Sequence, residues 1–110
     1  MTDSIGSIAI LGGTGDLGGG LARQWSRAGY KILIGSRTIE KGEAAAKALL
    51  DEFPDLNVTG FENLDAANQA DLVVLTVPFE HQLSTLETVK PGLSGKILIA
   101  VSYTHLRAHE

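Results

Sequence analysis

Residues 8–22 read IAILGGTGDLGGGLA, an apolar run followed by a cluster of glycines and then by the start of an apolar periodicity. A strand, a glycine turn and a helix in this order are typical of a nucleotide-binding unit. The glycines let the backbone turn sharply and let a pyrophosphate approach the amides, because they carry no Cβ. The N-terminus of the helix adds unpaired N–H groups and a partial positive charge. The stretch therefore predicts a phosphate-binding turn.

The glycines fit two related spacings, G-x-G-x-x-G from Gly13 and G-x-x-G-x-x-G from Gly12. The alternative is a turn used only for tight packing, but Gly19 and Gly20 weaken the start of a helix, which makes a purely structural purpose less economical. Asp16 is expected at the N-cap or in the first turn, where the helix dipole stabilises it. The residues predicted to contact a dinucleotide here are Gly12, Gly13, Thr14, Gly15, Asp16, Leu17 and Gly18.

Length and composition indicate one domain. The chain has 110 residues, 44% of them hydrophobic, which is enough for one core and too few for two. The net charge of −4 gives no reason to expect nucleic acid as a partner. There is no cysteine, so disulfides and thiolate chemistry are excluded. No apolar run approaches the length of a membrane span, and a cytoplasmic protein is expected.

Apolar, β-branched runs alternate with helical patterns, which predicts βαβ units and a parallel sheet. Strands are expected at 7–11, 31–35, 57–61, 71–76 and 96–101, and helices at 17–28, 39–53 and 79–89, with a shorter helix or turn at 64–69. Right-handed crossovers give a Rossmann-type, doubly wound α/β sheet with strand order 3-2-1-4-5. Because a complete dinucleotide domain often adds a further helix and strand, this domain is expected to be truncated.

Two side-chain arrangements are also expected in the helices. Glu43 and Lys47 are spaced to pair at i,i+4 along helix 39–53. Phe79, Leu83 and Leu86 share one face of helix 79–89.

The end of the second strand predicts which dinucleotide binds. NAD domains usually place Asp or Glu there to hold the ribose 2′-hydroxyl, whereas this chain has Ser36 and Arg37. The Arg37 guanidinium can bind a 2′-phosphate, and Lys41 can supply a second positive charge from the next helix. Thr14 can reach the same phosphate or the adenosine. We therefore expect NADP(H); the alternative is that both cations are ordinary surface charges.

The turn at Thr76, Val77 and Pro78 follows the fourth strand next to the topological switch point, where a nicotinamide would sit. We interpret it as a wall of the nicotinamide pocket. His81 lies near the same end of the sheet, but an exposed position on a helix explains it better than catalysis, and no catalytic residue is assigned. No metal cluster and no Tyr-x-x-x-Lys dyad is present in the sequence.

Three stretches together resemble the NADPH-dependent F420 reductases, also called F420H2:NADP oxidoreductases: residues 8–22, residues 34–37 with Lys41, and residues 74–81. The resemblance runs from about Ile8 to Val101. It implies that Thr14, Ser36, Arg37 and Lys41 grip the 2′-phosphate, and that hydride passes directly between NADP(H) and the deazaflavin coenzyme F420.

The resemblance also implies a protein about twice as long as this chain, in which the missing half covers much of the deazaflavin and completes a homodimer. Residues 1–101 are accordingly expected to form an incomplete NADP-binding domain, inactive alone. The tail 102–110 is polar and resembles the translation of a sequencing adapter, so it is treated as a separate, non-native segment.

The sequence leaves two alternative functions open. One is another NADP-dependent reductase of the same superfamily, such as a ferric, imine or carbonyl reductase. The other is a non-catalytic regulatory module that binds NADP.

Overall fold

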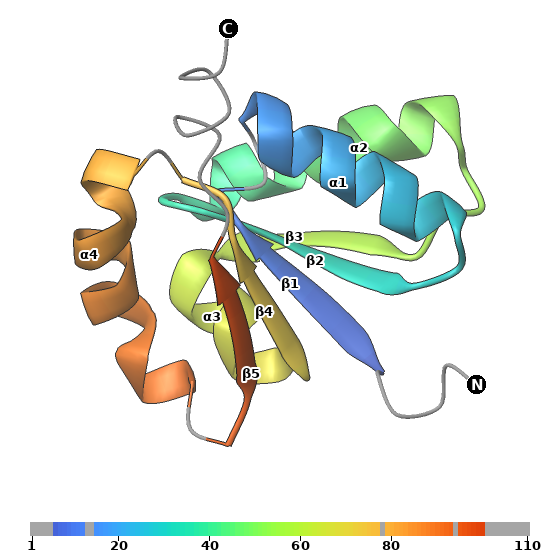
Figure 1. Cartoon of the computed structure of the whole chain (residues 1–110). Helices are drawn as coiled ribbons and strands as arrows, with labels where there is room; N and C mark the ends of the chain where they lie inside the picture. Colours follow the sequence, from blue (N-terminus) through green and yellow to red (C-terminus); the bar gives the residue numbers. More distant parts are fainter. Residues whose placement is uncertain (1–5, 13–14, 78, 94, 101–110) are drawn as a thin grey trace, which may run out of the picture.

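The computed structural model describes residues 6–12, 15–77, 79–93 and 95–100. They form one parallel sheet of five strands in the order β3-β2-β1-β4-β5, which confirms the predicted Rossmann-like topology (Figure 1). The strands are β1 (Ser7–Leu11), β2 (Lys31–Ser36), β3 (Val58–Glu62), β4 (Leu72–Leu75) and β5 (Ile97–Ala100). The helices are α1 (Asp16–Arg27), α2 (Ile39–Glu52), α3 (Asn63–Gln69) and α4 (Phe79–Val89), with a 3₁₀ turn at Lys90–Gly92.

The sheet lies between two helical layers, with α1 and α2 on one face and α3 and α4 on the other (Figure 1). Alternate strand residues feed the two cores, as the twofold period of a strand requires. The core under α1 and α2 contains Ile8, Ile10, Ala22, Ile32, Ile34, Ala46, Val58 and Val74. The core under α3 and α4 contains Ala9, Leu11, Leu33, Ala66, Ala67, Ala70, Val73, Leu75 and Val89.

The register of the strands determines which residues lie together at the carboxyl edge of the sheet. Leu11 pairs with Gly35 on one side and Leu75 on the other, and Ser36 pairs with Glu62. The last pairing extends β2 and β3 each by one residue beyond the predicted ends, so that α3 begins directly at Asn63. The residues that follow β1, β2, β3 and β4 therefore share one edge.

One expected side-chain pair is wrong, and one helix face is less buried than its apolar residues indicate. Lys47 pairs with Asp51, at 3.4 Å between Nζ and Oδ2, and not with the predicted Glu43. Leu83 is 70% exposed although Leu86, on the expected common face, packs against the core under α3 and α4. The reason is position, because α4 stands at the side of the molecule and packs mainly against α3 and the 3₁₀ turn, which leaves Leu83 exposed to solvent.

Two glycines bring α2 into backbone contact with β3. A Cβ on Gly42 would lie 2.6 Å from the carbonyl oxygen of Phe61, and a Cβ on Gly60 would overlap the backbone of Gly42. Any side chain at either position would push the helix off the sheet. The contact therefore sets the distance between α2 and β3.

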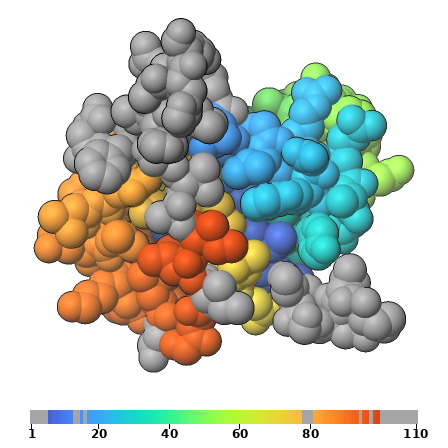
Figure 2. Space-filling view, in the orientation of Figure 1, coloured from blue at the N-terminus to red at the C-terminus, as the bar shows by residue number. Residues whose placement is uncertain are grey.

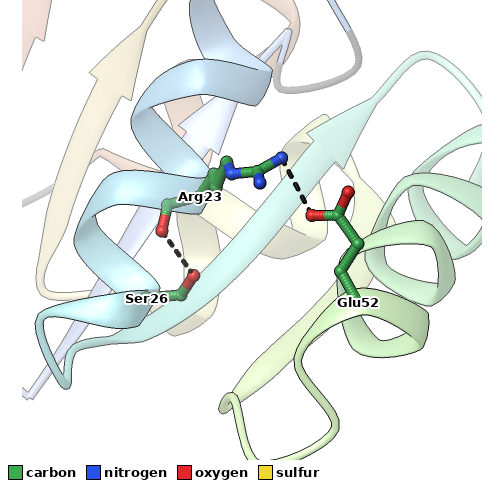
Figure 3. Close-up of polar contacts among 3 residues, drawn as sticks. All are labelled: Arg23, Ser26 and Glu52. Atoms are coloured by element: carbon green, nitrogen blue, oxygen red, sulfur yellow. Dashed lines mark hydrogen bonds and ion pairs between the residues drawn. The ribbon is translucent and has the colours of Figure 1, made fainter.

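The outer surfaces of α1 and α2 are joined near the amino edge of the sheet. Arg23 of α1 extends toward Glu52 of α2, with 2.8 Å between Nη1 and Oε1 (Figure 3). The guanidinium groups of Arg23 and Arg27 also lie 5.2 Å and 4.6 Å from the centre of the Phe53 ring. Ser26 donates a hydrogen bond to the Arg23 carbonyl, within α1 (Figure 3). The ion pair and the two ring contacts, but not the bond within α1, link α1 to the end of α2.

Strand β5 forms one edge of the sheet. Its atoms lie on the surface of the molecule (Figure 2), where Leu98 is 37% and Ile99 45% exposed. Within the described part of the chain, no helix is long and apolar enough to cross a membrane.

Candidate cofactor-binding site

The predicted phosphate-binding turn leaves β1 through Gly12, which has a φ of +79°. Its N–H continues the β1–β2 ladder by donating to the Gly35 carbonyl at 3.0 Å, and its own carbonyl accepts from Gly15 N–H at 3.1 Å. The positive φ favours glycine, which explains the residue at this point. Gly13 and Thr14, also predicted here, lie outside the described residues.

Helix α1 begins without a side-chain cap. Its N-cap is Gly15, which has no side chain. Asp16 is the first helical residue, so it occupies the first turn and not the N-cap, the two positions predicted for it. Helix α2 differs, because Thr38 Oγ1 accepts from the Lys41 N–H at 3.3 Å. The first-turn N–H groups of α1, those of Asp16, Leu17 and Gly18, have no acceptor within the helix. This end of α1 therefore has the properties of an anion site.

The turn lies against the end of β4. A Cβ on Gly12 would come within 2.6 Å of Val77 Cγ1 and 3.3 Å of Thr76 Oγ1. Both the N–H and the hydroxyl of Thr76 donate to the Leu11 carbonyl, at 2.9 Å and 2.8 Å. The predicted nicotinamide wall and the phosphate turn are thus tied together at the switch point between β1 and β4. Pro78 lies outside the described residues.

The residues predicted to hold the 2′-phosphate lie at the end of β2 and the start of α2. Ser36 is the last residue of β2 and is buried, while Arg37 follows it and is exposed. Lys41 is exposed in the first turn of α2. The structure thus places a hydroxyl and two cations between the end of β2 and the first turn of α2, and Glu62 of β3 pairs with Ser36 beside them.

A cavity of about 400 Å³ opens beside this corner. It lies between the ends of β2 and β3 and helix α4, and Ser36 and Arg37 are part of its wall. The other residues that line it are Glu62, Asn63, Leu64, Ser84, Thr85 and Thr88. None of these six was among the site residues predicted from the sequence.

The placement of some of these lining residues could be anticipated from the sequence. Ser84 and Thr88 are four residues apart, so they share a face of any helix. Asn63 lies two residues after the predicted strand 57–61, which places it near the carboxyl edge. What the sequence could not show is that α4 lies opposite the ends of β2 and β3, because that placement depends on tertiary packing.

His81 is exposed in α4 and does not line the cavity. No group of three or more His, Asp or Glu side chains within the described ranges is arranged to hold a metal ion.

Known proteins share this architecture and sequence. Residues 7–103 match the family model described as NADP oxidoreductase, coenzyme F420-dependent. The F420-dependent NADP reductase of Methanothermobacter marburgensis is 48% identical over 94 residues, which cover 84% of this chain and 42% of that protein. The Methanocaldococcus jannaschii protein of the same name is 46% identical over 98 residues, covering 86% of this chain and 44% of that protein.

A solved structure is also similar. The crystal structure of a putative F420-dependent NADP reductase from Arthrobacter sp. FB24 superposes with a TM-score of 0.73 at 29% identity, over 90% of this chain and 47% of that one. The chain therefore spans less than half the length of the relatives it matches. On the extent of the family match, this chain belongs to the coenzyme F420-dependent NADP oxidoreductases.

Proposed function

We propose that this chain is the NADP(H)-binding portion of an oxidoreductase that transfers a hydride between NADP(H) and coenzyme F420. The observation that carries the proposal is the pairing of an uncapped helix N-terminus after a glycine turn with Arg37 at the end of β2. The first suits a pyrophosphate, and the second suits a 2′-phosphate. Family membership supplies the second coenzyme.

The residues fit the coenzyme at the positions the structure describes. Gly12 has the conformation and the close neighbour that exclude a side chain, which leaves the backbone of the turn open to a phosphate. The proposed contacts are Gly12, Gly13, Thr14, Gly15, Asp16, Leu17 and Gly18 for the pyrophosphate region, Ser36, Arg37 and Lys41 for the 2′-phosphate, and Thr76, Val77 and Pro78 beside the nicotinamide.

When bound, the nicotinamide supplies the hydride donor or acceptor. The chain contributes binding and orientation. Arg37 and Lys41 neutralise phosphate charge, and Val77 presents an apolar surface that excludes water beside the ring. No protein acid or base is required, because transfer between two coenzymes depends on proximity in a dry pocket.

The full-length protein provides the direct test. Reduced F420 and NADP⁺ are mixed with it, and the deazaflavin absorbance is followed; recovery of the oxidised chromophore supports the proposal. No change at high enzyme concentration contradicts the F420 assignment. NADP⁺ binding by the 110-residue chain, measured by calorimetry, tests the coenzyme assignment separately.

Three further proposals concern the whole protein. The 110-residue chain is inactive alone, the full-length protein is a homodimer, and residues 1–101 rather than 102–110 form the nucleotide-binding domain. Activity assays and sedimentation of both lengths test the first two. Deletion of 102–110 without loss of NADP⁺ binding tests the third.

A further inference from the structure

The peptide unit that joins Leu11 to Gly12 is held by hydrogen bonds on both sides. Its carbonyl oxygen, on Leu11, accepts from the N–H and from the hydroxyl of Thr76, at 2.9 Å and 2.8 Å. Its N–H, on Gly12, donates to the Gly35 carbonyl at 3.0 Å. The two neighbours of β1 in the sheet, β4 and β2, therefore hold the last peptide unit before the glycine turn.

One of these bonds is not required by the sheet. The bond from the Thr76 N–H continues the parallel pairing of β1 with β4, and any residue except proline can make it. The bond from the hydroxyl exists only because residue 76 carries a hydroxyl. Thr76 is 3% exposed, so water has little access to replace this bond. The side chain thus adds a constraint that the fold alone does not supply.

The course of the turn depends on the peptide unit that Thr76 holds. Gly12 has a φ of +79°, and its carbonyl accepts from the N–H of Gly15, the N-cap of α1. A rotation of the Leu11–Gly12 peptide would change the direction in which the chain leaves β1. It would then move the unpaired N–H groups at the start of α1. Donors that are already in place before a ligand arrives bind it more tightly than donors that must be ordered.

The Thr76 hydroxyl is suited to hold the turn and unsuited to bind a phosphate itself. Its single proton is used in the bond to the Leu11 carbonyl, so its oxygen can only accept a further hydrogen bond. A pyrophosphate offers acceptors and not donors. The same oxygen would lie 3.3 Å from a Cβ on Gly12, so it is directly beside the first residue of the turn.

We propose that Thr76 is a positioning residue for the coenzyme, whose hydroxyl holds the Leu11–Gly12 peptide in the orientation in which the turn and the N-terminus of α1 receive the pyrophosphate. The hydroxyl acts through the turn and not through a contact with the nicotinamide. The inference rests on the proposed NADP(H) binding.

Three ligands separate the parts of the coenzyme. NADP⁺ carries the 2′-phosphate, the pyrophosphate and the nicotinamide, whereas 2′-phospho-ADP-ribose lacks the nicotinamide and 2′-AMP also lacks the pyrophosphate. Calorimetric titration of the 110-residue chain measures the affinity for each. In Thr76→Ala we expect NADP⁺ and 2′-phospho-ADP-ribose to bind more weakly by the same factor, about threefold to tenfold, as follows from losing one hydrogen bond. The affinity for 2′-AMP should be unchanged.

Two further variants test the role of the hydroxyl. Thr76→Ser keeps it and should restore the affinity for both ligands that carry a pyrophosphate. Ser26→Ala is the matched control, because Ser26 is also 3% exposed and donates its hydroxyl to a backbone carbonyl, that of Arg23, near the C-terminus of α1. It should leave all three affinities unchanged. Circular dichroism confirms that each variant is folded, and Thr76→Val, which keeps the side-chain volume, replaces Thr76→Ala if the alanine variant does not fold.

The remaining outcomes contradict the inference in different ways. Weakening of NADP⁺ alone would show that Thr76 acts on the nicotinamide. Equal weakening of all three ligands, or no recovery in Thr76→Ser, would show a general loss of structure. Unchanged binding of NADP⁺ by Thr76→Ala would overturn the inference and leave the proposed function intact. If NADP⁺ does not bind to the unaltered chain, the proposed function fails and the inference fails with it.

Discussion

Arg37 is an exposed cation at the end of a strand whose last residue, Ser36, is buried. Its side chain is not needed for the core, so a substitution there tests coenzyme choice with little effect on folding. We expect Arg37→Ala to weaken NADPH binding by about 1.5 to 3 kcal/mol, since a charge-assisted phosphate contact is lost. NADH, which lacks the 2′-phosphate, should bind as it does to the unaltered chain. Calorimetric titration with both coenzymes measures the difference.

Arg27→Ala is the control for this experiment, since Arg27 is exposed at the far end of α1. It should leave the ratio of the two affinities unchanged. Equal weakening of NADPH and NADH by Arg37→Ala would contradict the assignment of the 2′-phosphate.

At the level of single residues, the sequence predicted the location of residues that come at the end of an apolar strand. Ser36 and Arg37 are examples, because the end of an apolar strand can be read directly. Asn63, Ser84 and Thr88 were missed as site residues because three separate elements bring them together. The hydrogen bond from the Thr76 hydroxyl to the Leu11 carbonyl was also missed, because it joins the ends of two strands that are far apart in the sequence.

Among the elements, α2 and β3 make the contact most sensitive to substitution. Gly60→Ala would force a Cβ into the backbone of Gly42, and backbone cannot move aside as a flexible side chain can. We expect a loss of at least about 2 kcal/mol in the free energy of unfolding, typical of severe overpacking. Urea denaturation followed by circular dichroism measures it. A loss below about 0.5 kcal/mol would show that α2 is not held by this contact.

Gly20 in α1 is a glycine at which a side chain is expected to stabilise the fold. A Cβ there meets nothing within 4 Å, and the residue is exposed in a helix. Gly20→Ala should therefore raise the free energy of unfolding by about 0.5 to 1 kcal/mol, because alanine loses less conformational freedom than glycine. The same urea titration checks this, and a decrease would mean that the site needs glycine for a contact beyond the described residues.

The existence, order and type of the elements were predictable because apolar periodicity and glycine turns are local signals. Two details of the helices could not be predicted from periodicity. Leu83 does lie on an apolar stripe, but burial depends on a neighbour, and α4 stands at the side of the molecule. Lys47 had acidic residues four positions away on both sides, and propensity could not choose between Glu43 and Asp51.

At the scale of the whole molecule, β5 is an edge of the sheet whose outer side is paired with no other described strand, and we expect this edge to govern association in solution. Its four residues, Ile97–Ala100, include no charge, proline or glycine that would block pairing with another strand. We expect concentration-dependent self-association of the 110-residue chain, and we expect Ile99→Lys to shift it toward the monomer. Sedimentation velocity over a range of concentrations measures both.

Thr59→Lys, on the opposite edge strand β3, is the matched control and should leave the association unchanged. Monomeric behaviour of the unaltered chain at all concentrations would contradict a role for the β5 edge.

The backbone contact between Gly42 and Gly60 has a consequence for protein engineering. It anchors α2 at a point just beyond Lys41, so the segment 36–41 joins two elements whose separation is already set. Under the proposed function, coenzyme preference and thermodynamic stability depend on adjacent but separate stretches of chain. Under the same proposal, the exposed residues Arg37 and Lys41 are the ones to exchange for acidic or neutral residues in order to redesign the preference from NADP toward NAD, whereas the buried Ser36 belongs to the scaffold.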